Sequence, residues 1–96
     1  MSKVLDAAIT TFLNELEELR EKNPVDEVCK ALEDMFDAQS AVDGKALNEQ
    51  SAEFKKAIDA LASATKAVKN AKDDPSKTAD AVNQSNAAVK AVLGTL

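Results

Sequence analysis

Apolar side chains in the first part of the chain recur every three or four positions, which is the spacing of one face of an α-helix. The stripe consists of Leu5, Ile9, Phe12, Leu16 and Leu19. Charged and amide side chains fall largely on the opposite side, so the helix would be amphipathic. The pattern therefore predicts a helix over residues 2–22 with one buried face.

Residues that interrupt helices are scarce, because the 96-residue chain contains two glycines and two prolines. An all-β chain of this length would need a turn about every 8–12 residues. Much of the sequence is instead Ala, Leu, Glu and Lys, which favour helices. We therefore expect long helices, packed as a single domain over residues 1–96.

The first expected break is at Asn23-Pro24. Asn is a favourable N-cap and Pro is preferred at the first helical position, so a second helix is predicted over residues 24–42. Its core stripe is expected to be Val25, Val28, Leu32, Met35, Gln39 and Val42, with Phe36 beside it. Cys29, the only cysteine, is expected to be a small buried apolar residue there.

The second expected break is at Asp43-Gly44, where the apolar stripe slips by one position. After the slip it consists of Leu47, Ser51, Phe54, Ile58, Leu61, Thr65 and Val68. The third helix is predicted over residues 45–72, about 42 Å long, whereas helices of about 19 residues span about 29 Å. We therefore expect it to overhang, bend or fray at one end.

The third expected break is at Asp74-Pro75, before a helix over residues 75–93. Its expected core stripe is Ala79, Val82, Asn86, Val89, Leu93 and Leu96. This stripe continues the preceding spacing without a slip, so a kinked continuous helix remains an alternative. Pro75 favours a turn, because its ring clashes with the carbonyl four residues back. Asn86 occupies an expected core position, unless this helix is poorly buried and Asn86 lies at its rim.

These elements predict an all-α fold, an antiparallel up-down-up-down four-helix bundle. The alternative is a three-helix bundle with a loosely attached or kink-continued C-terminal helix. Many of the apolar residues are alanines, which allow helices to pack closely but bury little area each.

No set of residues forms a recognisable chemical site. The absence of histidine excludes His-based metal sites and Ser–His or Cys–His nucleophiles. Aligning Gly44 with the glycine of a calcium-binding EF-hand loop leaves one carboxylate, Asp43, among the first three ligand positions, and Gln50 at the last. We therefore expect no enzymatic activity, no cofactor and no metal.

Charge is unevenly distributed along the chain. Residues 1–43 carry 4 basic and 11 acidic side chains, whereas residues 44–96 carry 8 basic and 6 acidic ones. The first half would repel nucleic acid, so nucleic acid is not an expected partner. An acidic ridge is the candidate interaction surface for a basic partner, the alternative being an ordinary solvated face. Its residues are Glu15, Glu17, Glu18, Glu21, Asp26 and Glu27.

The sequence therefore favours a non-enzymatic helical interaction protein, such as an adaptor, scaffold or assembly factor, with a protein partner. The alternative is a lipid-binding or apolar-ligand-binding bundle that opens to expose residues 45–72 and 75–93. A membrane surface is the less favoured partner, and homo-oligomerisation is left open. The start of the chain, Met1 to Val4, lacks the apolar block of a signal peptide, which favours a cytoplasmic location.

Overall fold

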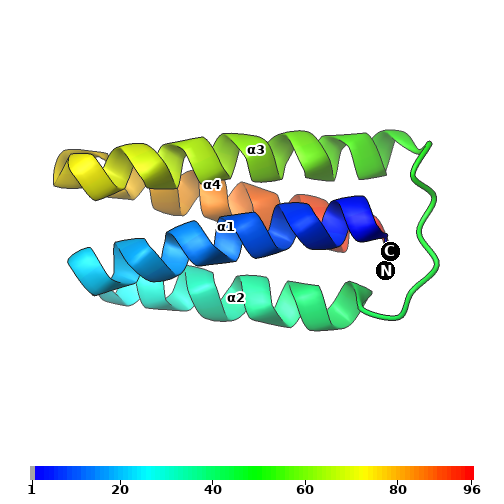
Figure 1. Cartoon of the computed structure of the whole chain (residues 1–96), viewed down its shortest axis with the longest axis horizontal. Coiled ribbons are helices and arrows are strands. Elements are labelled where there is room, and N and C mark those ends of the chain that lie inside the picture. Colours follow the sequence, from blue (N-terminus) through cyan, green and yellow to red (C-terminus); the bar gives the residue numbers. More distant parts are fainter. Residues whose placement is uncertain (1) are drawn as a thin grey trace.

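The computed structural model of the protein describes residues 2–96, which form a four-helix bundle about 37 Å long (Figure 1). Its α-helices are α1 (Lys3–Lys22), α2 (Asp26–Val42), α3 (Ala52–Asp73) and α4 (Thr78–Leu93). A short 3-10 turn, Pro75–Lys77, precedes α4, and residues 2–96 contain no strand. The predicted four-helix bundle is confirmed.

Successive helices run in opposite directions along the bundle (Figure 1). Around the bundle, however, the order is α1, α2, α4, α3: α1 packs against α2 and α3, and α4 packs against the same two helices. The pairs α1–α4 and α2–α3 lie on the diagonals and make no close backbone approach over residues 2–96. As a result, α1 and α3 are parallel neighbours, as are α2 and α4.

The connection from α2 to α3 corrects the predicted third helix. Helix α3 begins at Ala52, seven residues later than predicted, because the chain must first cross one end of the bundle along its diagonal. An extended chain covers about 3.3 Å per residue, whereas a helix rises about 1.5 Å. The expected overhang, bend or fraying of residues 45–72 therefore takes the form of a loop over residues 43–51, and the helix is confined to Ala52–Asp73.

Three local features hold this loop in place. Gly44 turns the chain with a φ of 76°, a value that favours glycine. Ser51 caps α3, its Oγ accepting a hydrogen bond of 3.1 Å from the backbone N–H of Phe54. At the loop's other side, the hydroxyl of Ser2 donates a hydrogen bond to the carboxylate of Glu49. The loop is thereby attached to the start of α1.

The two proline-containing breaks differ from each other. Helix α2 begins at Asp26, and Asn23 ends α1 by donating its backbone N–H to the carbonyl of Leu19, rather than capping α2 as predicted. At the second break, α3 ends at Asp73 and the chain reverses, so the predicted turn at Pro75 is confirmed.

Hydrogen bonds from Ser76 organise the turn after α3. The carboxylate of Asp74 accepts the hydroxyl of Ser76 at 2.7 Å and its backbone N–H at 3.1 Å. These two hydrogen bonds, the hydroxyl first, hold the pKa of Asp74 below its usual value.

The core of α1 follows the predicted stripe, whereas that of α2 departs from its prediction at several positions. All five predicted residues of α1 are buried, and Leu13 joins them. Val25, which precedes α2, and Phe36 are 37% and 42% exposed, and Cys29 and Gln39 are half-buried. Ala31 and Ala38 are buried instead. Alanines therefore form part of the buried face of α2, where larger side chains were predicted.

Helix α4 is rotated relative to the prediction. Its buried residues are Ala81, Ser85, Ala88 and Val92, whereas Asn86 and Leu93 are exposed. Asn86 does not occupy the core position that the stripe predicts, but is exposed, as in the alternative that places it at the rim. The neighbouring helix α3 buries alanines such as Ala64 and Ala71, and α3 and α4 make the most extensive backbone approach in the bundle. Close approach requires small side chains on both helices, and α4 presents its small-residue face.

Candidate interaction surface

Helix α4 carries a second apolar stripe, outside its buried face. This outer stripe consists of Ala79, Val82, Asn86, Val89 and Leu93 on α4, together with Leu96 just beyond its end. Its members are separated by steps of three and four residues, the spacing of a coiled-coil seam. Val82 and Val89 are half-buried, while Leu93 and Leu96 are 42% and 63% exposed. The stripe is therefore a partly exposed seam with no helix of this bundle covering its full length.

The first of two grooves beside α4 lies between the N-terminal ends of α2 and α4. This α2–α4 groove has a volume of about 360 Å³ and is lined by Val25, Glu27, Thr78, Ala79, Val82 and Asn83. A hydrogen bond of 3.1 Å from Nδ2 of Asn23 to Oγ1 of Thr78 ties the α1–α2 turn to the start of α4. This bond fixes the exposed Val25 beside the outer stripe.

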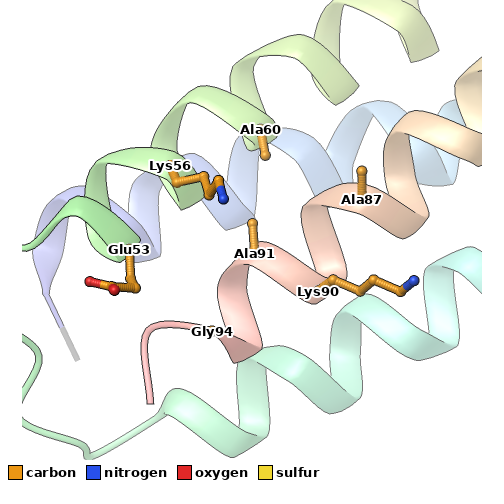
Figure 2. Close-up of a pocket in the computed structure, with 7 residues that line it drawn as sticks. All are labelled: Glu53, Lys56, Ala60, Ala87, Lys90, Ala91 and Gly94. Atoms are coloured by element: carbon orange, nitrogen blue, oxygen red, sulfur yellow. The ribbon is translucent and has the colours of Figure 1, made fainter.

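The second groove lies between α3 and α4, on the other side of α4 (Figure 2). This α3–α4 groove has a volume of about 460 Å³, and alanines 60, 87 and 91 contribute its apolar lining. Figure 2 shows the side chain of Lys56 extending from α3 toward α4, whereas Lys90 points away along the bundle. The groove is open because the facing side chains are short.

Charge is depleted on α4. Over Thr78–Leu93 it has two charged side chains, Asp80 and Lys90, whereas the helix α2, of similar length, has six. Depletion of charged residues is a compositional mark of the central part of protein–protein interfaces. Low charge, exposed leucines and flanking grooves thus coincide on one helix.

The six acidic residues of the predicted ridge do not share one surface. Glu15 is half-buried, and both Glu15 and Glu18 form ion pairs with Lys72 of α3, at 2.5 Å and 3.1 Å. Glu27 instead lines the α2–α4 groove. Of the remaining three, Glu17 is half-buried and Glu21 and Asp26 are exposed. The ridge is divided between the α1–α3 side and the α2–α4 side of the bundle.

The pairing with Glu15 and Glu18 also changes the titration of Lys72. The hydrogen bond with Glu15, followed by that with Glu18 and the two negative charges, raises the pKa of Lys72 above its usual value, against the opposing effect of partial burial. Both acids therefore contact α3, although the side chain of Glu18 remains 54% exposed.

Residues 2–96 contain neither a metal-binding cluster nor a membrane-spanning helix. No group of three or more potential ligand side chains in this range is arranged to hold a metal ion. None of the helices in the described part of the chain has the length and apolar character needed to cross a bilayer.

The chain matches no protein-family model, no curated protein and no solved structure. The outer stripe and the grooves beside it are the candidate interaction surface of residues 2–96. The spacing of the outer stripe is evident in the sequence, but the sequence-based prediction placed this stripe in the core of the bundle. The signal that separates the two faces is the spacing of Ala81, Ser85 and Ala88, a row of small residues at steps of four and three.

Proposed function

We propose that this protein is a non-enzymatic helical interaction protein, an adaptor, scaffold or assembly factor, and that it binds a helix of a protein partner through the outer stripe of α4. The observation that carries this proposal is the partial exposure of a seam with coiled-coil spacing on a helix that already buries a separate face.

The energetics favour a partner of this kind. Leu93 and Leu96 expose 42% and 63% of their surface, and covering each would contribute about 1 kcal/mol. The α2–α4 groove, whose lining includes Ala79 and Val82 of the stripe, can receive side chains of a partner helix. An amphipathic helix laid along such a surface uses anchors spaced at three and four residues, as the stripe itself does.

Leu93→Glu is the variant that tests this proposal. It places a charge within the proposed interface, near the C-terminal end of α4, where the partner would have to desolvate it. Phe36→Glu is a matched control, since Phe36 has the same exposed fraction, 42%. Phe36 follows Glu27 by nine residues, or two and a half helical turns, and so lies on the side of α2 opposite the α2–α4 groove.

The measurement is affinity capture with the tagged chain from cells that express the untagged protein, so that both other proteins and native copies of this chain can be recovered. We expect wild type and Phe36→Glu to retain a specific protein and Leu93→Glu to lose it. Retention of every captured protein by Leu93→Glu would contradict the proposed use of the outer stripe.

A further inference from the structure

We propose that two copies of this chain exchange their α3–α4 hairpins, forming a domain-swapped dimer in which residues 43–51 are the hinge. Such an exchange replaces contacts within one chain by the same contacts between two chains. The surface that binds the second copy is therefore the α1–α3 and α2–α4 interface of the bundle. The outer stripe takes no part in it, so this inference is independent of the proposed function.

The hinge is weakly attached to the bundle. Seven of its nine residues are exposed, while Leu47 and Ser51 are half-buried. The hydrogen bond from Ser2 to Glu49 joins it to the start of α1. Further side-chain hydrogen bonds lie within the hinge, such as the 2.9 Å bond from the hydroxyl of Ser51 to the carbonyl of Asn48. Opening the hinge therefore costs the bond from Ser2 and the partial burial of Leu47.

The sequence of the hinge favours a helix that it does not form in the single chain. Five of the seven residues 45–51 are Lys, Ala, Leu, Glu or Gln, which have high helix propensity. In a helix that starts at Lys45, Leu47 lies on the same side as the buried Phe54, about two turns away. Gly44 then takes the N-cap position, which requires no positive φ. An extended α3 thus agrees with the local sequence better than the loop does.

An extended α3 cannot connect to the α2 of its own chain. Helix α2 ends and α3 begins at the same end of the bundle, on diagonally placed helices (Figure 1). Neighbouring helix axes lie about 9 Å apart, so the diagonal is about 13 Å. Seven more helical residues move the start of α3 about 10.5 Å beyond that end, to about 17 Å from the end of α2. The three Cα–Cα steps from Val42 to Lys45 span at most about 11 Å, so the α3–α4 hairpin must pack against a second copy.

Exchange restores the contacts between hairpins. The ion pair of Lys72 with Glu15 and the hydrogen bond of Asn23 with Thr78 each join one hairpin to the other. In the dimer both contacts form between chains. Leu47 is the central residue of the hinge, so the two-fold axis passes beside it and the two copies of Leu47 meet there. The dimer therefore keeps the interface of the single chain and adds a helical hinge and a leucine contact.

Refolding at high concentration is the first test. The chain is unfolded in urea, refolded at millimolar or at micromolar concentration, and examined by sedimentation velocity. We expect a dimer after refolding at millimolar concentration and a monomer after refolding at micromolar concentration, because exchange requires a second copy. A wild-type chain that refolds only to monomer at millimolar concentration would overturn the inference.

Substitution of Gly44 tests the role of the hinge. Gly44→Ala disfavours the closed loop, since L-residues are strained at a φ of 76°. Gly44→Asn is the matched control, because Asn tolerates positive φ better. We expect the dimer dissociation constant of Gly44→Ala to be at least about tenfold lower than that of Gly44→Asn, because each dimer opens two hinges. Far-UV circular dichroism establishes that both variants are folded, and equal dissociation constants would exclude residues 43–51 as the hinge.

Mixed cross-linking distinguishes hairpin exchange from any other dimer. A tagged Asn23→Cys chain and an untagged Thr78→Cys chain, both in a Cys29→Ser background that removes the only native cysteine, are refolded together at millimolar concentration and oxidised. Nδ2 of Asn23 lies 3.1 Å from Oγ1 of Thr78, so hairpin exchange brings the two thiols together across chains. We expect a covalent heterodimer from the mixture and none from either variant alone.

Two controls make the cross-linking decisive. A single chain carrying both Asn23→Cys and Thr78→Cys establishes that this site forms a disulfide. With that established, a mixture that dimerises without the covalent heterodimer would exclude hairpin exchange. If refolded wild type stays monomeric while Leu93→Glu still loses its captured protein, the exchange is wrong and the proposed interaction function stands.

Discussion

The Nζ atom of Lys72 lies 2.5 Å from Oε1 of Glu15, and this ion pair joins the end of α3 to the parallel helix α1. Nζ also lies 3.1 Å from Oε2 of Glu18. The side chains of Lys72 and Glu15 are 17% and 18% exposed, so solvent screens their attraction less than that of a surface pair. The contact therefore fastens two helices that no short connection holds together.

Removing this charge should destabilise the bundle. We expect Lys72→Met to lower the free energy of unfolding by about 1 kcal/mol, since it leaves the half-buried Glu15 without its cation. Lys69→Met, an exposed position one turn earlier on α3, is the control and should change stability by less than about 0.5 kcal/mol. Urea unfolding of the three proteins measures the difference, and equal effects of the two substitutions would contradict the role of Lys72.

The same contact predicts a dependence on alkaline pH. The pKa of Lys72 is raised above its ordinary value of 10.5, chiefly by its hydrogen bond with Glu15. A pKa that is higher in the folded state gives stabilisation that is fully present below the unfolded value and is lost as pH rises through the folded value. The stability difference between wild type and Lys72→Met should thus be constant from about pH 7 to pH 9 and shrink above about pH 10.5. A difference that grows at high pH would contradict this assignment.

The rotation of α4 gives a third prediction. Ser85 is fully buried, and its hydroxyl donates a hydrogen bond of 2.7 Å to the carbonyl of Ala81. We expect Ser85→Leu to lower the free energy of unfolding by about 2 kcal/mol, because the closely packed site has no room for three more carbons. Asn86→Leu, one position along, should not destabilise the chain. Thermal unfolding shows which of the two variants is less stable. The order of their stabilities would be reversed if Asn86 faced the core.

Gly44 should be sensitive to substitution through its backbone alone. Its φ is 76°, and a Cβ atom added there would meet nothing within 4 Å. We expect Gly44→Ala to cost about 1–2 kcal/mol, because L-residues are strained in this region. Asn tolerates it better, so Gly44→Asn should cost less. Chemical denaturation measures both costs, and a cost for Gly44→Asn equal to or larger than that for Gly44→Ala would contradict backbone strain as the cause.

The lipid-binding alternative predicts a measurable change on anionic vesicles. Opening the bundle would require α3 and α4 to leave their neighbours, which breaks the contact of Lys72 with α1 and exposes buried alanines. We therefore expect trypsin to cleave residues 45–96 at the same rate with and without phosphatidylserine vesicles at low salt. Strong protection by vesicles, enhanced by Lys72→Met, would favour the lipid-binding alternative.

Residue size decides which parts of the fold were predictable. The seam of α1 was predicted correctly because its large residues, from Leu5 to Leu19, lie on one side only. Helix α4 has apolar residues on two sides, and the prediction placed the side with the larger residues in the core. Ala81 and Ala88 are buried because α3 approaches closely, which is a property of the neighbouring helix and not of the local pattern.

The loop before α3 shows a second reason why part of the fold could not be predicted from local spacing. Leu47 and Ser51 continue the stripe that begins again at Phe54, so the spacing extended the predicted helix through the loop. The order of helices around the bundle requires an extended crossing there, and no local pattern encodes that order. The prediction of the acidic ridge has the same limit. It could not include the contact of Glu18 with Lys72, because Lys72 is more than fifty positions away in the sequence.

The diagonal crossing of residues 43–51 also bears on how the chain assembles. Each hairpin, α1–α2 and α3–α4, closes a short connection, so we expect it to form on its own early in folding. The parallel pair α1–α3 joins Glu18 to Lys72, 54 positions apart, and closing so long a segment costs more chain entropy. Docking of two preformed hairpins is then the slow step, and its rate should respond to substitutions at the hairpin interface more than to those within either turn.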